Sequence, residues 1–340
     1  MSETQRSVFP GAGPRGTRAI LAAGLVAILA GCQSPVRAPA FTLTREDWGY
    51  AGAKGKRLIT DHFDVRTTLQ DQVLVDVLPG FLESCYERYQ ELIPPRVEPG
   101  QPLATYVFET RWQWGRFTDE FVPERARVYR NIQSGGYMDS PTATAVLYWL
   151  GRDRTLAVAA HEGWHQYVSR TLPLPIPAWL NEGLATQMEA FELSNGIPRF
   201  EPRKNYFRRN YLRTALVVKE KGLFDLSELL RINAGDVLES SARPTDTYYA
   251  QLWSMTLFLL EGPDKTYRDG FRTLLADAGT ETMRVAVNAY RVATPAAANL
   301  SFGEIVFRKY ITEDLDAFSG RYIQFARDLL LTTSGMTSMR

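Results

Sequence analysis

Two of the chain's three histidines stand four residues apart, in the segment His161-Glu-Gly-Trp-His165. On a helix this spacing puts both imidazoles on one face, one turn apart, where they can bind a single metal ion. Glu162 lies on the adjacent edge, where its carboxylate can take a proton from metal-bound water. A further carboxylate, Glu182, follows in the segment Pro-Ala-Trp-Leu-Asn-Glu-Gly-Leu-Ala. This pattern predicts a zinc hydrolase.

A zinc ion (Zn²⁺) held by two histidines and a glutamate keeps a fourth position for water, which is the arrangement of a catalytic site. Zinc lowers the pKa of that water towards about 7 and polarises a carbonyl group. Glu162 would then act as base towards the water and as acid towards the leaving amine. The alternative is a coincidental His-Glu-x-x-His on an exposed helix. The apolar residues 157–160 before the motif favour a buried helix and therefore a genuine metal site.

The elements that must position these groups can be read from the periodicity of apolar residues and from turn signals. Strands are predicted over residues 58–67, 103–108 and 142–149, the last after a turn at Gly135-Gly136, and helices over 69–93 and 112–121. Pro79 is expected to kink or restart the first helix. The histidine helix is predicted over 154–169 with Asp153 as its cap, and Pro177 opens the helix that carries Glu182.

Beyond Pro202 the pattern is almost entirely helical. Helices are predicted over residues 205–221, 247–260, 271–276 and 281–290, and two more reach Leu331. Strands followed by helices indicate an α+β fold with a helical second half. The chain has 340 residues, 45% of them hydrophobic and 23% charged, with a net charge of +1. This composition is typical of a globular protein and gives no reason to expect nucleic acid as a partner.

The N-terminus has the pattern of a secretory signal. Three arginines precede an apolar run over residues 19–30, which ends in Leu-Ala-Gly-Cys32. The run is short for a membrane span, and its ending resembles a bacterial lipobox, in which the cysteine is lipidated. An uncleaved membrane anchor is the alternative. Gln33 follows rather than aspartate, which favours the outer membrane by the sorting rule of enterobacteria.

The predicted organisation is therefore a lipoprotein signal peptide over residues 1–32, lipidation at Cys32 and a flexible tether over 33–55. A catalytic domain follows over 56–335, with a sheet-containing lobe at 56–172 and a helical lobe at 173–335. The protein would be lipid-anchored in the cell envelope, on its periplasmic or extracellular face. Cys85 falls in an apolar helical series and is expected to be a small buried hydrophobic residue rather than a reactive thiol. The oligomeric state does not follow from the sequence.

The segment His161-Glu-Gly-Trp-His165-Gln, followed by Trp179-Leu-Asn-Glu-Gly-Leu-Ala185, resembles the gluzincin metallopeptidases. It is most similar to the peptidase-MA-like families of bacterial lipoproteins and secreted proteins. The likeness extends to the segments at residues 60–65 and 249–253, and so covers most of 56–335. It implies a zincin-like fold, in which a twisted sheet covers the active helix and a cleft opens against a helical lobe. It also implies His161, His165 and Glu182 as zinc ligands, Glu162 as the base, and a peptide or protein substrate.

Two positions depart from related families. Thermolysin-like enzymes have an aspartate four residues after the ligand glutamate to support a histidine, whereas this chain has Thr186, whose hydroxyl would do so more weakly. Zinc aminopeptidases carry a Gly-x-Met-Glu-Asn element, and this chain has Gly136-Tyr-Met-Asp-Ser140. Asp139 could therefore bind a substrate amine, or belong to a plain turn at the entry of a strand.

Further candidates surround the motif. An oxyanion donor is expected across the cleft, and Tyr249 is preferred to Tyr248, although adjacent aromatic residues often only pack. Asn181 would bind the substrate backbone or cap its helix, and His62 is expected in a strand with a satisfied hydrogen bond. A basic run is expected to be a solvated face with one arginine paired to an internal acid, or a contact for an anionic polymer. It consists of Arg203, Lys204, Arg208, Arg209, Arg213, Lys219 and Lys221.

The sequence thus favours a lipid-anchored zinc metallopeptidase that hydrolyses peptide bonds through a zinc-bound water, with Glu162 as the general base. The first alternative is a non-hydrolytic envelope lipoprotein that uses the fold as a structural or binding module. The glutamate base argues against it, because a structural site needs none and usually has four protein ligands. The second alternative retains the chemistry but acts on amides of peptidoglycan cross-links, for which no recognition motif is visible. Specificity cannot be read from the motif.

Overall fold

A six-stranded mixed sheet forms the scaffold of the first half of the chain. Its strands are β1 (Thr44–Tyr50), β2 (Ala53–Ile59), β3 (Phe63–Thr67), β4 (Leu103–Phe108), β5 (Gly136–Asp139) and β6 (Thr144–Tyr148), in the spatial order β1-β2-β3-β4-β6-β5. The pairs β3–β4 and β4–β6 are parallel and the other pairs are antiparallel. The short strand β5 therefore forms one edge of the sheet.

This computed structural model describes residues 38–132, 135–218, 222–239 and 244–331, all within one compact unit over Val36–Arg340. The predicted signal peptide and Cys32 lie outside these residues, so the anchor and the envelope location remain predictions. No helix in the described ranges has the length and apolarity to cross a membrane. The predicted tether over 33–55 is wrong in its second part, because residues 44–50 form β1 and residues 53–55 begin β2.

Helices cover both faces of the sheet. The helices α1 (Gln72–Leu92) and α4 (Arg152–Thr171) pack on the face that presents Val107 and Leu147. The helix α2 (Arg111–Phe121), followed by the short α3 (Ala126–Tyr129), covers the face that presents Phe108 and Tyr148. Successive residues of β4 and β6 thus point to opposite faces, and both faces are buried under helices.

The helix α1 confirms the predicted helix in this region and continues through Pro79 without the expected restart. Cys85 on α1 is fully buried, as expected, and burial raises the pKa of its thiol. The predicted strand over 58–67 is divided by a turn that contains His62. This histidine has the expected hydrogen bond, with its Nδ1 2.6 Å from Glu83 Oε2, and its ring stacks on Tyr86 at 3.8 Å.

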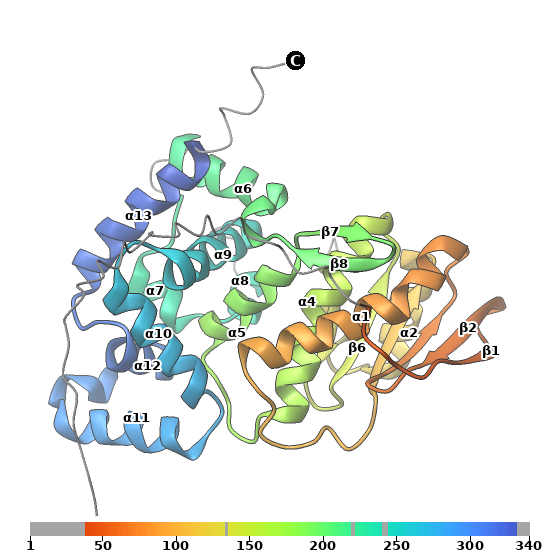
Figure 1. Cartoon of the computed structure of the whole chain (residues 1–340), viewed down its shortest axis with the longest axis horizontal. Helices are drawn as coiled ribbons and strands as arrows, with labels where there is room; N and C mark the ends of the chain where they lie inside the picture. The colour runs from red at the N-terminus through yellow and green to blue at the C-terminus, as the bar shows by residue number, and fades with distance from the viewer. Residues whose placement is uncertain (1–37, 133–134, 219–221, 240–243, 332–340) are drawn as a thin grey trace, which may run out of the picture. The chain divides into compact units, whose positions relative to one another are not determined.

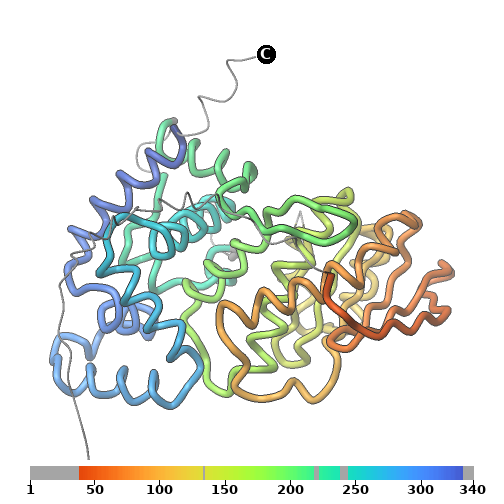
Figure 2. Tube along the Cα trace, in the orientation of Figure 1, coloured from red at the N-terminus to blue at the C-terminus, as the bar shows by residue number. Residues whose placement is uncertain are grey.

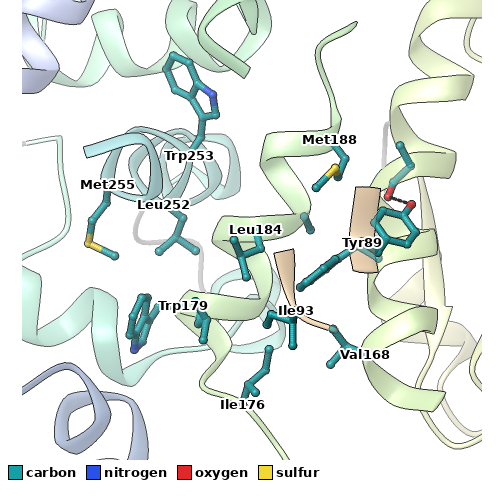
Figure 3. Packing of buried hydrophobic residues seen from close by; sticks show 14 of the residues in the cluster. Tyr89, Ile93, Val168, Ile176, Trp179, Leu184, Met188, Leu252, Trp253 and Met255 are labelled. Carbon is teal, nitrogen blue, oxygen red and sulfur yellow. Dashed lines mark hydrogen bonds between the residues drawn. The ribbon is translucent and has the colours of Figure 1, made fainter. Parts of the chain in front are cut away.

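The helix α4, which carries the histidine motif, is fixed in place by α1. Tyr89 of α1 donates a hydrogen bond to the carbonyl of Ala160, at 2.5 Å (Figure 3). A side chain on Gly163 would meet this hydroxyl, because a Cβ there would lie 2.7 Å from Tyr89 Oη. Glycine at this position therefore allows α1 and α4 to pack closely. The helix cap is Gly151 rather than the predicted Asp153, which lies in the first turn and favours the helix dipole there.

The second half of the described chain is largely helical, as predicted. Its elements are α5 (Ala178–Ala185), the 3₁₀ turn η1 (Thr186–Met188), the hairpin β7 (Phe191–Ser194) and β8 (Ile197–Phe200), the turn η2 (Pro202–Lys204), α6 (Tyr206–Arg213), the π-helical turn η3 (Thr214–Val218), α7 (Leu226–Arg231), α8 (Ala234–Glu239), α9 (Thr245–Glu261), α10 (Lys265–Asp277), α11 (Glu281–Ala293), the turn η4 (Pro295–Asn299), α12 (Phe302–Tyr310) and α13 (Leu315–Leu331). The helices α9 to α13 gather beside α5, on the side away from the sheet (Figures 1 and 2). The mixed sheet with this helical half agrees with the α+β class.

The helix α5 lies at the centre of the core, between α4 and α9. Its Trp179 and Leu184 are fully buried, and Leu252 of α9 packs near them (Figure 3). Gly183 faces α9 so closely that an added Cβ would overlap the Thr256 hydroxyl. This close packing determines the position of α5, and therefore of Glu182, relative to the histidine helix.

The hairpin β7–β8 was not predicted. Its turn contains Asn195 and Gly196, with φ values of 51° and 80°. Two residues with positive φ define the type I′ turn, for which Asn-Gly is the preferred sequence. The hairpin lies beside α1 (Figures 1 and 2). Phe81 of α1 and Phe191 of the hairpin make an edge contact at 4.9 Å.

Candidate metal centre

Three side chains converge between α4 and α5. His161, His165 and Glu182 each offer one ligand atom, and these atoms all lie within 4.8 Å of one another. Glu182 Oε2 is 3.4 Å from Nε2 of His161 and 3.2 Å from Nε2 of His165. The separation of four residues on α4 puts the two imidazoles on one face, as predicted, and the packing of α5 brings the carboxylate to them. The three residues form a largely buried group that could hold a metal ion.

The chemistry of this group fits a divalent cation. Glu182 Oε2 is buried and has no hydrogen-bond partner among the described residues, although a buried carboxylate oxygen is costly to leave unsatisfied. A metal ion bound by both imidazoles would satisfy it. Each histidine presents Nε2 to this point, while its Nδ1 is occupied by another partner. This division of the two ring nitrogens is characteristic of histidine ligands.

Asn181 supports the second histidine. Its Oδ1 lies 3.1 Å from Nδ1 of His165 and accepts a hydrogen bond from Trp164 Nε1 at 2.9 Å. Because the amide oxygen only accepts, His165 must carry its proton on Nδ1, which leaves Nε2 free to bind a metal. The predicted capping role of Asn181 is wrong, since the cap of α5 is Pro177, while its predicted contact with a substrate backbone stays a prediction.

The first histidine is supported by Glu189, which sequence reasoning missed. Glu189 Oε1 lies 2.9 Å from Nδ1 of His161. The support expected from Thr186 is wrong, because its hydroxyl donates to the carbonyl of Gly183 in α5, at 2.7 Å. The 3₁₀ turn η1 after α5 brings Glu189 back towards α4. A carboxylate therefore supports His161 from a position three residues later than expected. No fixed sequence spacing predicts this contact.

Glu189 is itself held by the buried guanidinium group of an arginine. Arg208 of α6 makes two hydrogen bonds to it, from Nε at 2.7 Å and from Nη2 at 2.6 Å, and Asn205 adds a third at 2.8 Å. Burial raises the pKa of Glu189, but the charge and hydrogen bonds of Arg208 outweigh burial and lower it to about 2. The basic run was expected to contain one arginine paired to an internal acid, and this expectation is confirmed by Arg208. Lys219 and Lys221 lie outside the described ranges.

Replacing Glu189 by glutamine is expected to weaken the binding of a divalent metal ion, with zinc as the probe, by about 10–100-fold, which is the range for a residue that hydrogen-bonds a histidine ligand. Glutamine can still accept a hydrogen bond from His161, but it removes the negative charge that increases the basicity of the ring. Zinc affinity measured by competition with a chromophoric chelator would test this. Glu192→Gln is the matched control, since Glu192 lines the same cleft but pairs with Lys204. Equal zinc affinities of Glu189→Gln and the wild type would contradict the role.

Glu162 faces the cleft next to the ligand group. It lines the wall together with His161 and Tyr249, and no hydrogen bond joins its carboxylate to another described residue. Burial raises the pKa of Glu162, although the neighbouring histidines oppose this shift. A carboxylate that has no hydrogen-bond partner and whose pKa is raised can exchange protons with a ligand in the cleft.

The acidic groups also make the centre attractive to a cation. Burial lowers the pKa of His161, but its interactions with Glu182 and Glu189 outweigh burial and raise it to about 10. Burial raises the pKa of Glu182, but the histidine charges leave it below its ordinary value. The field that favours a positive charge on an imidazole is the same field that favours a bound metal cation.

The two tyrosines proposed for the oxyanion have different surroundings. Tyr249 lines the cleft, and its ring meets that of His161 edge-on at 5.8 Å. Tyr248 is fully buried against Phe224 and does not line the cleft. Burial raises the pKa of the Tyr249 phenol well above its ordinary value, so it stays a hydrogen-bond donor at neutral pH. The structure therefore places Tyr249, rather than Tyr248, beside the metal centre.

Asp139 belongs to the sheet rather than to the site. It is fully buried, pairs with Arg125 at 2.7 Å, and accepts a hydrogen bond from the Thr142 hydroxyl at 2.8 Å. It does not line the cleft, whereas Gly135 and Gly136 at the start of the same strand do. The turn interpretation is correct for this residue, and the predicted contact with a substrate amine is wrong.

A cleft of about 1010 Å³ opens above these groups. Its walls come from the first half of α4, the start of β5, the hairpin β7–β8 and the N-terminal ends of α6 and α9. This volume is at the upper end of the roughly 300–1,000 Å³ of pockets that enclose small ligands. The cleft can therefore admit a ligand as large as a peptide segment.

Comparison with known proteins does not identify the chain. The sequence matches no family model, and neither a curated protein nor a solved structure is significantly similar to it.

Proposed function

We propose that the protein is a zinc-dependent metallopeptidase of the gluzincin type, with a zincin-like fold. The observation that supports this most strongly is the convergence of His161, His165 and Glu182 beside a cleft that also contains Glu162. Two imidazoles and one carboxylate suit zinc, and a set of three protein ligands is typical of catalytic rather than structural zinc. When bound, zinc supplies a Lewis acid that makes water more acidic and polarises a carbonyl group.

The residues of the chain have separate tasks in this proposal. Glu162 accepts a proton from the attacking water and passes it to the leaving amine, and its raised pKa suits a group that both accepts and donates. Tyr249 donates a hydrogen bond to the carbonyl oxygen as negative charge develops on it. Asn181 and Glu189 hold the two imidazoles in the orientation that binds the metal.

A peptide substrate is favoured by the position of β5. This edge strand begins at the cleft, where Gly135 and Gly136 form part of the wall. Unpaired backbone groups along the edge of a sheet can bind an extended peptide as an additional strand. An extended peptide bound in this way would pass the metal centre.

The proposal is tested by metal analysis of the purified protein together with digestion of a diverse peptide pool. We expect stoichiometric zinc and cleaved peptides, with cleavage lost after chelation and restored by zinc. An intact pool in the presence of bound zinc would instead support the alternative, a non-hydrolytic binding module. Cleavage of cross-linked muropeptides but not of linear peptides would support action on peptidoglycan.

A further inference from the structure

We propose that the cleft selects peptides by a large apolar or aromatic side chain, which binds against Leu193, Tyr206 and Phe207. This inference deepens the proposed peptidase function by naming the substrate class. The three side chains are 40%, 60% and 38% exposed, yet all three line the cleft beside the metal centre. Large apolar side chains that stay exposed in one concave site are typical of binding surfaces.

The apolar wall is built from two separate elements. Leu193 comes from the hairpin β7–β8, while Tyr206 and Phe207 come from the first turn of α6. Each element is anchored elsewhere, the hairpin by the contact of Phe191 with α1 and α6 by Leu212, which is fully buried. Packing therefore fixes the two elements that carry the exposed residues at the cleft.

The apolar lining continues along α4 to the metal ligands. Ala157 and Val158 line the cleft and lie one helical turn before His161 and Glu162. On the other side, Arg208 lies 5.3 Å from the ring of Phe207 and 4.8 Å from the ring of Tyr249. Phe207 and the proposed oxyanion donor thus flank the same guanidinium, so a side chain bound at Phe207 belongs to a peptide that reaches the catalytic groups.

Charged groups of the cleft are largely paired with one another. Glu192 pairs with Lys204 at 2.6 Å, and Arg208 pairs with Glu189 at 2.6 Å. Arg154, which also lines the cleft, lies over the ring of Phe207 at 5.0 Å. The surface that these pairs leave for a ligand is therefore mainly apolar. An acidic peptide side chain would also meet the carboxylates of Asp153 and Asp246, which line the cleft, although Asp246 lies 3.9 Å from Arg208.

The test measures binding in the Glu162→Gln protein, so that it does not depend on turnover. Two pools of short peptides would be compared, one with phenylalanine or leucine and one with aspartate at randomised positions. We expect the apolar pool to bind at least about tenfold more tightly, and Phe207→Ala and Tyr206→Ser each to remove most of this preference. Trp112→Ala is the matched control, because Trp112 is 63% exposed but does not line the cleft.

Equal binding of the two pools, or a preference that survives both cleft substitutions, would overturn this inference. Loss of the preference in Trp112→Ala would also contradict it, because the effect would then not come from the cleft. The result is separable from the proposed function. Cleavage by the wild type without an apolar preference defeats only the specificity, whereas apolar binding without any cleavage defeats only the peptidase.

Discussion

Replacing Glu162 by glutamine is expected to leave the zinc content unchanged and to lower peptide hydrolysis by about 10²–10⁴-fold, the contribution of a positioned general base. Glutamine has nearly the size of glutamate but cannot accept the proton of the attacking water. The metal should remain, because the ligand atoms belong to His161, His165 and Glu182 rather than to Glu162. Steady-state hydrolysis of a cleaved peptide, together with elemental analysis of the same preparation, would measure both effects.

A carboxylate elsewhere in the cleft provides the control for this substitution. Glu201 lines the cleft but pairs with Arg199 at 3.1 Å, away from the metal ligands. Glu201→Gln is expected to hydrolyse peptides at close to the rate of the wild type. If Glu162→Gln retained full hydrolysis, the assignment of the base would be wrong even with zinc in place.

The helices and the histidine pair were predictable because their signals are local. The period of apolar residues before and within the motif predicts α4. On a helix, the separation of four residues then puts His161 and His165 on the same face. The approach of Glu182 is different, since it depends on the packing of α5 between α4 and α9. The sequence placed a carboxylate within reach on the next helix, and the resemblance to known metallopeptidases assigned it as a ligand, but no spacing contains the packing that brings it to the histidines.

The hairpin formed by β1 and β2 was not predicted, for a physical reason. Strand β1 has the sequence Thr-Arg-Glu-Asp-Trp-Gly-Tyr and is mostly exposed, so it lacks the alternation that marks a half-buried strand. It is held by backbone pairing with β2 and by Trp48 and Tyr50 near its end, of which Tyr50 lies 5.2 Å from Phe108. Such strands resemble a polar linker in sequence. The second hairpin, in contrast, carried a usable signal in Asn195-Gly196.

The support of the site was the least predictable part. Glu189 reaches His161 only because the chain turns through η1 after α5, and Arg208 reaches Glu189 from α6. These contacts join three elements whose relative positions depend on the tertiary fold. Sequence reasoning located the two functional helices but placed the histidine support on Thr186, because it borrowed a spacing from a related family.

Replacement of the proposed carboxylate ligand, Glu182, should strongly lower the affinity for zinc. Glu182→Gln is expected to lower zinc affinity by more than the roughly 10–100-fold expected for an outer partner such as Glu189. The amide has nearly the same volume but lacks the negative charge that the two imidazoles face. Hydrolysis should be lost together with the metal, in contrast to Glu162→Gln, which should lose hydrolysis alone.

The unfolding of Glu182→Gln with and without zinc gives a readout independent of activity. A metal that binds only the folded state stabilises it by about 4 kcal/mol when its free concentration is 1,000-fold above the Kd. The wild type and Glu162→Gln should both show this zinc-dependent rise in unfolding temperature, while Glu182→Gln should show little of it at the same zinc concentration. Because the two variants carry the same change from glutamate to glutamine, a general loss of stability cannot mimic the pattern. Stoichiometric zinc in Glu182→Gln after dialysis against a weak chelator would refute the ligand set, and with it the proposed peptidase centre.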